Sequence, residues 1–95
     1  MSNTYTLHNN TDDQQYEFHI DGHIAKIEYL IKEEKNKIYL IHTEVPEALS
    51  GRGIGSALVR QVLADIETQG WQLVPRCPFV ASYIKRHPEW QRLVE

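Results

Sequence analysis

The chain is organised around residues 50–56, which read Ser50-Gly51-Arg52-Gly53-Ile54-Gly55-Ser56. Glycine occupies every second position from 51 to 55, so no side chain covers the backbone N–H groups between them. A helical pattern begins here, and the start of a helix carries unpaired N–H donors and a partial positive charge. This predicts a site for a phosphate or pyrophosphate, with Arg52 adding a cation and Ser56 a hydroxyl. The alternative is a glycine turn that serves only to begin the helix.

The spacing of the glycines separates this loop from two better-known phosphate-binding motifs. The pattern is G-x-G-x-G, whereas dinucleotide-binding loops have G-x-G-x-x-G and open a doubly wound sheet. The loop also lacks the Gly-Lys-Ser/Thr ending of a P-loop for nucleoside triphosphates. Neither of those ligands is therefore expected.

The segments before the loop have the pattern of antiparallel strands. Residues 1–13 are polar and are expected to be a flexible N-terminal segment. Alternation over residues 16–20 predicts a half-buried strand, and Asp21-Gly22 then supplies a hairpin turn into a strand over 23–32. A third strand is predicted over 38–45. Its first half is apolar at every position, which predicts a central strand covered on both faces.

The segments after the loop complete an α/β domain. Apolar residues recur at helical spacing over 53–69, and Gly70 is the expected terminator. The apolar side of this helix comprises Ile54, Leu58, Val59, Val62, Leu63 and Ile66. A short strand over 71–77 should lie parallel to the third strand, and a closing helix is expected over 79–86. The predicted fold is a mixed sheet in β-β-β-α-β-α order, forming one domain over residues 14–95.

The composition and charge of the chain argue against several classes of function. The chain has 95 residues, a net charge of -3 and one cysteine, Cys77. This balance gives no case for a nucleic-acid partner, which a basic patch would indicate. No apolar run is long enough to span a membrane, no signal pattern opens the chain, and no disulfide can form within it, so a cytoplasmic location is expected. The scattered histidines predict no metal site.

Residues 50–58 resemble the pyrophosphate-binding motif of GNAT acetyltransferases, Q/R-x-x-G-x-G/A, which opens the central helix of that fold. The segments 42–46 and 77–80 are similar to a small branch of the superfamily, the YjdJ-type domains, and the match covers roughly residues 14–95. The resemblance implies a GNAT-like fold and an N-acetyltransferase that moves an acetyl group from acetyl-coenzyme A, its cosubstrate, to an amine. The acceptor would be a small molecule or peptide, and the protein a monomer or weak dimer.

The resemblance also implies which residues contact the coenzyme. Backbone groups at Gly51, Arg52, Gly53, Ile54, Gly55 and Ser56 would hold the pyrophosphate. The backbone at Thr43, Glu44 and Val45 would pair with the pantetheine arm as a further strand. Ser50 departs from the motif, which has Gln or Arg there, so one side-chain contact is missing and weaker coenzyme binding is expected.

Cys77 and His42 are the candidate catalytic residues. Cys77 ends the fourth predicted strand, where a thiolate could take the acetyl group as a thioester. Strict alternation places His42 on the same face as Leu40 and Glu44, from which it could approach Cys77 as a general base. Glu44 is the alternative base. The competing interpretations are a buried cysteine that packs as a small apolar residue and a structural histidine.

Two questions stay open at this point. Tyr83 lies in a stretch similar to one in larger GNAT enzymes, where a tyrosine can protonate the leaving thiolate, but the residue fits better as a core aromatic side chain. The chain also lacks the N-terminal helices that help form the acceptor site in larger GNAT proteins. A coenzyme A or acyl-coenzyme A sensing module with little or no transferase activity is therefore the alternative function.

Overall fold

The computed structural model describes residues 5–95, which form one five-stranded mixed sheet with two helices. The strands are β1 (His8–Asn10), β2 (Gln15–Ile20), β3 (His23–Lys32), β4 (Lys37–Glu44) and β5 (Gln72–Pro75). The helices are α1 (Ile54–Gln69) and α2 (Pro78–Arg86), and short 3-10 turns cover Glu33–Lys35, Glu47–Leu49 and Pro88–Leu93. The strands follow one another across the sheet in sequence order, β1 to β5. All neighbours are antiparallel except β4 and β5, which confirms the predicted parallel pair.

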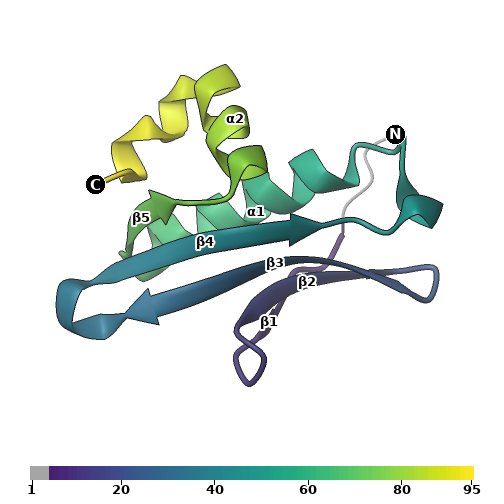
Figure 1. Cartoon of the computed structure of the whole chain (residues 1–95), viewed down its shortest axis with the longest axis horizontal. Helices are drawn as coiled ribbons and strands as arrows, with labels where there is room; N and C mark the ends of the chain where they lie inside the picture. Colours follow the sequence, from purple (N-terminus) through teal and green to yellow (C-terminus); the bar gives the residue numbers. More distant parts are fainter. Residues whose placement is uncertain (1–4) are drawn as a thin grey trace.

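Both helices cover the same face of the sheet (Figure 1). Every third or fourth residue of α1 is buried against the inward side chains of β2, β3 and β4, as its apolar stripe predicts. Leu58 and Leu63 are fully buried, so truncation of either to alanine should cost about 2–5 kcal/mol of stability. The helix ends at Gly70, whose N–H donates to the carbonyls of Ile66 and Glu67 and whose positive φ lets the N–H of Trp71 turn back to the Ile66 carbonyl.

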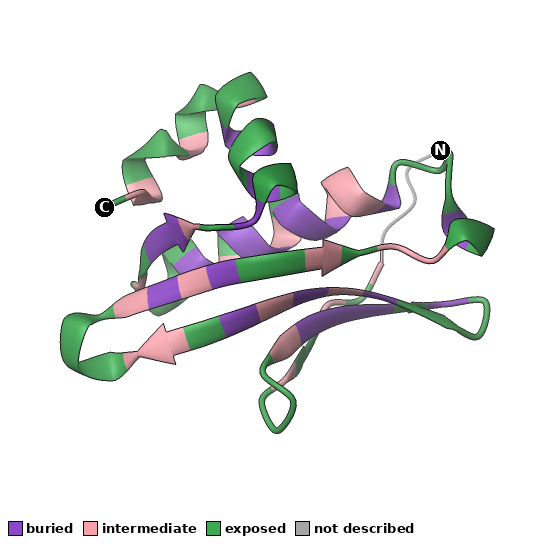
Figure 2. Ribbon diagram, in the orientation of Figure 1, coloured by how far each residue is buried: buried purple, intermediate pink, exposed green. Residues whose placement is uncertain are grey.

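The opposite face of the sheet carries no helix within residues 5–95 (Figure 1). This corrects the expectation that the third predicted strand, now β4, is covered on both faces. Ile38 and Leu40 are fully buried under the helices, whereas Ile41 is 47% exposed and Leu30 on β3 is 39% exposed. Figure 2 shows buried and partly exposed positions alternating along the first half of β4, followed by an exposed stretch. We call this uncovered side the outer face. Its apolar side chains made β4 look like a doubly covered strand in the sequence.

A one-residue shift of register interrupts the pairing of β3 with β4. Tyr29 lies opposite Leu40, but the preceding residue, Glu28, lies opposite His42, so Ile41 is the extra residue of a bulge. The bulge reverses the alternation of side chains in the last part of β4. Thr43, opposite the fully buried Ile27, turns to the helix-covered face. His42 turns to the outer face.

β4 and β5 separate part-way along β4. Their pairing runs from Lys37 opposite Gln72 to Leu40 opposite Pro75, and the N–H of Cys77 donates one further bond, of 2.8 Å, to the Leu40 carbonyl. Beyond that point the chain turns into α2, for which Cys77 is the residue before the first turn. From His42 to Glu44, β4 is paired with β3 alone among the strands of residues 5–95.

The structure adds one strand to the predicted order. His8–Asn10 form β1, paired antiparallel to β2, inside the segment predicted to be flexible. Tyr5 and Leu7 also pack against the core, so residues 5–10 are better described as part of the sheet and its edge. Residues 1–4 of that predicted segment lie outside the described residues. Within residues 5–95, no helix is both long and apolar enough to cross a membrane.

Candidate functional site

The glycine-rich loop leaves three amide groups free at the start of α1. Gly51 and Gly53 have φ values of 78° and 71°, which side-chain-bearing residues adopt only with strain. The first helical bond runs from the Ala57 N–H to the Gly53 carbonyl, at 3.1 Å. Within residues 5–95, the N–H groups of Ile54, Gly55 and Ser56 have no hydrogen-bond acceptor. They are the donors that an anion at a helix N-terminus uses.

A groove of about 320 Å³ opens over these amides. It is lined by Val45, Leu49, Ser50, Gly51, Gly53, Ile54, Gly55, Ser56 and Phe79. We call it the loop groove. A Cβ built on Gly55 would lie 2.9 Å from the Phe79 ring, so only glycine lets the ring of α2 approach α1 this closely. The groove therefore has a polar floor of amides and an apolar wall.

Arg52 does not line the loop groove. Its guanidinium donates to the Asp21 carboxylate at 2.9 Å, and both side chains are exposed. Asp21 belongs to the turn between β2 and β3, so this ion pair ties the loop to the hairpin. Hydrogen bonding to Asp21 raises the pKa of Arg52, which stays charged and could exchange this partner for a phosphate.

Cys77 lies beside Thr43 at the place where β4 and β5 separate. Cys77 is 3% exposed, and the distance from Cys77 Sγ to Thr43 Oγ1 is 3.3 Å. The two residues meet because the bulge at Ile41 turns Thr43 inward and the bond to the Leu40 carbonyl fixes the backbone of Cys77. The thiol therefore has one hydroxyl partner, which can accept from it or donate to it.

His42 and Glu44 lie on the outer face, away from Cys77. The expectation that His42 shares a face with Leu40 is wrong, because the bulge intervenes between the two residues. His42 Nε2 is instead 3.8 Å from Glu44 Oε1, and both side chains are exposed. The structure thus separates the two predicted catalytic residues. It leaves an exposed imidazole and carboxylate together at the end of β4.

Comparison of the chain with known protein families identifies a matching family. The model of a GCN5-related N-acetyl-transferase family matches residues 15–93 of the chain. The chain belongs to this family. The match spans β2 to the last 3-10 turn, so it includes the loop groove, Cys77 and both helices. Acetyl transfer from acetyl-coenzyme A is the reaction typical of GCN5-related N-acetyltransferases; the narrower resemblance to YjdJ-type domains stays a prediction.

Tyr83 lies in the core. It is one of three buried residues of α2, and its ring stacks on His87 with centroids 4.3 Å apart. Burial raises the pKa of Tyr83, with Arg60 and Arg86 opposing this and Glu89 adding to it, so the hydroxyl stays protonated at neutral pH. Tyr83 is not among the residues that line the loop groove.

Sequence reasoning missed two features of the site. It assigned Thr43 only a backbone contact, although the Thr43 hydroxyl is the partner of Cys77. It also left out Phe79, which is 38% exposed and forms a wall of the loop groove. The sequence does contain a signal for Phe79, which is its position directly after Pro78. A proline marks the first turn of a helix, and an aromatic side chain in that turn is incompletely buried. No comparable signal marks Thr43.

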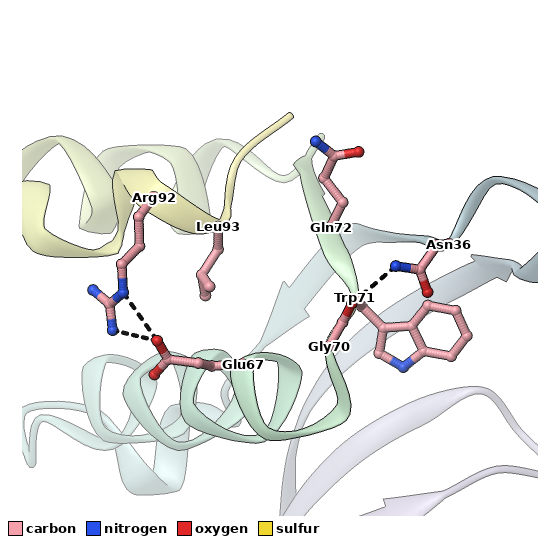
Figure 3. A pocket seen from close by; sticks show the side chains of 7 residues that line it. All are labelled: Asn36, Glu67, Gly70, Trp71, Gln72, Arg92 and Leu93. Carbon is pink, nitrogen blue, oxygen red and sulfur yellow. Dashed lines mark hydrogen bonds and ion pairs between the residues drawn. The ribbon is translucent and has the colours of Figure 1, made fainter.

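A second hollow, of about 350 Å³, lies at the other end of α1 (Figure 3). Its walls include Gly70, Trp71 and Leu93, and an ion pair of 2.6 Å between Arg92 and Glu67 closes one side. The 16 residues of α1 separate this hollow from the loop groove, roughly 24 Å along the helix. It is therefore a separate feature. Within residues 5–95, no three His, Cys, Asp or Glu side chains gather to hold a metal ion.

Proposed function

We propose that this protein binds acetyl-coenzyme A across the loop groove and transfers the acetyl group to an amine. The observation that carries the proposal is the set of three amides, Ile54, Gly55 and Ser56, without acceptors in the described chain. Their positions at a helix N-terminus suit the pyrophosphate. The alternative of a purely structural turn gives no reason for an open groove above them.

The end of β4 is the proposed site of the pantetheine arm. From Thr43 onwards β4 has no strand beside it on the β5 side within residues 5–95, and Val45 continues from it into the loop groove. Backbone groups at Thr43, Glu44 and Val45 can therefore pair with the amides of an extended ligand. A ligand lying along this edge from the α1 amides is directed toward Thr43 and Cys77.

The covalent route uses Cys77 as the acetyl carrier. The Cys77 sulfur attacks the acetyl carbon, a new C–S bond forms, the bond to the coenzyme sulfur breaks, and the proton of the Cys77 thiol ends on the departing coenzyme sulfur. The amine then attacks the acetyl carbon of the Cys77 thioester, the C–N bond forms, and the Cys77 sulfur leaves. The amine proton ends on the Cys77 sulfur, which restores the thiol. The Thr43 hydroxyl can donate to the Cys77 sulfur whenever that atom is anionic.

The direct route transfers the acetyl group from the coenzyme to the amine without Cys77. An exposed base is then needed for the amine proton, and His42 and Glu44 are the candidates on the outer face. Their position fits an amine that arrives from the uncovered side of the sheet. His42 thus keeps a proposed role as a base toward the acceptor, while its predicted role as a base for Cys77 has no geometric support.

A coenzyme-sensing module is the second candidate function. The observation in its favour is the outer face, where no helix of residues 5–95 encloses an acceptor. A sensor would bind coenzyme A and acetyl-coenzyme A and turn over no amine.

The test measures binding and transfer separately. Calorimetry with coenzyme A reports the loop groove, and release of free coenzyme thiol in the presence of a panel of amines reports transfer. Binding with transfer supports the enzyme, and binding without transfer supports the sensor. Absence of binding would refute both.

A further inference from the structure

A groove on the outer face has the features of a binding site that the coenzyme does not use. It is lined by Leu30, Lys32, Tyr39, Ile41 and Arg76 and encloses about 350 Å³. We call it the outer groove. It shares no residue with the loop groove, which lies at the N-terminus of α1. Leu30 and Ile41, both substantially exposed, give it apolar walls.

The charge of the outer groove selects an anion. Lys32 Nζ and Arg76 Cζ each lie 5.5 Å from the centroid of the Tyr39 ring, so two cations gather around one aromatic side chain. No acidic side chain lines the groove, and neither cation has a carboxylate within 4.0 Å in residues 5–95. In a chain with a net charge of -3, this is a local positive site with no internal counter-ion.

One end of the outer groove adjoins the place where β4 and β5 separate. Arg76 directly precedes Cys77, and Ile41 directly follows Leu40, whose carbonyl accepts from the Cys77 N–H. Cys77 and Thr43 lie on the helix-covered side of the same junction. A ligand in the outer groove therefore approaches the transfer site from the side that no helix covers. His42 and Glu44 lie on this side as well.

The spacing within the groove fixes the shape of such a ligand. From Tyr39, where the cations gather, to Ile41, at the junction, is two strand residues or roughly 7 Å. An anion over Tyr39 and an amine beyond Ile41 are thus separated by the length of a short apolar chain. An α-amino acid, whose amine and carboxylate share one carbon, is too short to occupy both ends.

We propose that the outer groove binds the acceptor, a primary amine joined by a short apolar chain to a carboxylate held between Lys32 and Arg76. This inference rests on the proposed transferase function and names its substrate class. In the reaction the amine nitrogen bonds the acetyl carbon, the bond from that carbon to sulfur breaks, and the amine proton ends on the sulfur. The carboxylate takes no part in bond making and acts only in binding.

The kinetic test compares two amines of equal chain length, 6-aminohexanoate and n-hexylamine. Wild-type protein should acetylate 6-aminohexanoate with a kcat/KM at least tenfold higher, about the effect of one charge-assisted contact. Arg76→Gln and Lys32→Gln should each reduce this preference about tenfold, and glycine should be a poor acceptor. Lys35→Gln, which removes an exposed lysine from the neighbouring 3-10 turn, is the matched control and should keep the preference. Equal rates for the two amines in wild-type protein would overturn the proposal.

A binding measurement separates this proposal from the proposed function. With coenzyme A present, 6-aminohexanoate should shift the backbone amide resonances of Leu30, Tyr39 and Ile41, and n-hexylamine should not. The shifts should vanish in the Lys32→Gln, Arg76→Gln double variant. If the carboxylate leaves these resonances unmoved, the outer groove is not its site, whether or not coenzyme A binds. If the shifts occur but no amine is acetylated, the groove stands as a carboxylate-binding site and the transferase function fails.

Discussion

Thr43 and Cys77, 34 residues apart in the chain, face each other with Thr43 Oγ1 3.3 Å from Cys77 Sγ. Two backbone features produce this contact. The bulge at Ile41 turns Thr43 toward the helices, and the bond from the Cys77 N–H to the Leu40 carbonyl fixes where α2 begins. The contact places a hydroxyl beside the only thiol of the chain, at the end of the proposed path for the pantetheine arm.

Incubation with acetyl-coenzyme A and no amine should leave one acetyl group on Cys77 if transfer is covalent. Intact-protein and peptide mass spectrometry measure this directly. Cys77→Ala should still bind coenzyme A, because the α1 amides belong to another segment, but should lose turnover by several orders of magnitude. His42→Ala should leave acetylation of Cys77 intact and slow only the amine step, since His42 lies on the outer face.

Two results would contradict the covalent route. A Cys77→Ala protein that acetylates amines at the wild-type rate would make the transfer direct. A slower acetylation of Cys77 in His42→Ala would mean that the imidazole reaches the thiol, against the observed arrangement of β4.

Two replacements of Thr43 distinguish the effect of its hydroxyl group from the effect of its size. Thr43→Val keeps the shape and removes the donor, so a Cys77 thiolate formed during transfer loses one hydrogen bond, about 1–2 kcal/mol or roughly a tenfold lower rate. Thr43→Ser keeps the hydroxyl and should stay within about threefold of wild type. Single-turnover kinetics of Cys77 acetylation measure the effect. Equal rates for the valine and serine variants would limit Thr43 to packing.

The fold was predictable wherever one physical signal dominated. Periodicity and Gly70 gave α1 nearly residue for residue, because a 16-residue amphipathic helix leaves a long repeating signal. β1 escaped prediction because His8, Asn9 and Asn10 carry no apolar alternation. They form a strand through backbone pairing with β2 at the edge of the sheet.

The site was less predictable because its geometry depends on a bulge. Ile41 is β-branched and apolar, so the sequence makes it look like an ordinary buried strand residue. Only the register with β3 shows that Ile41 is the extra residue. A shift of one residue reverses the face on which every later side chain of the strand lies. His42 therefore lies on the outer face and Thr43 on the helix-covered face, the reverse of what strict alternation predicts. The loop needed no such information, since its glycine spacing and the following helix are local.

Gly55→Ala should weaken coenzyme binding by moving Phe79. The new methyl group would meet the ring at 2.9 Å, so the ring must swing away and disturb the wall of the loop groove. We expect calorimetry with coenzyme A to show about a tenfold loss of affinity, the effect of one disrupted apolar wall. Gly70→Ala is the matched control. It strains a positive φ at the far end of α1, where a Cβ would meet no atom within 4 Å, and should lower stability without changing affinity.

Asp21→Asn should tighten coenzyme binding at low salt by releasing Arg52. The ion pair at 2.9 Å competes with the phosphates for the guanidinium, and both partners are exposed, so the gain should be only two- to fivefold. Raising the salt concentration should abolish it. In the Arg52→Gln background the same replacement should bring no gain. A gain that persists there would show that Asp21 acts on the coenzyme directly.

Glu17 should make stability depend on pH in the acid range. This carboxylate lies on β2 and is 5% exposed. Burial opposes its ionisation, but hydrogen bonds from Gln15, Asn10 and His19 outweigh burial and lower the pKa of Glu17 to about 2. A group whose pKa is lower in the folded state stabilises the fold above its ordinary pKa. That contribution is lost as pH falls from about 4.5 toward 2.

Glu17→Gln tests this pH dependence by comparing the free energy of unfolding of the variant and of the wild-type protein at two pH values. Urea unfolding at pH 6 and at pH 3 should show the wild-type protein losing on the order of 1–2 kcal/mol more than the variant over this interval. The amide of glutamine keeps the size of the side chain but does not titrate, so its curve should be flatter. Glu34→Gln, which alters an exposed carboxylate of the 3-10 turn, should follow the wild-type curve. Parallel curves for Glu17→Gln and wild type would mean that the hydrogen bonds from Asn10, Gln15 and His19 do not favour the carboxylate over the acid.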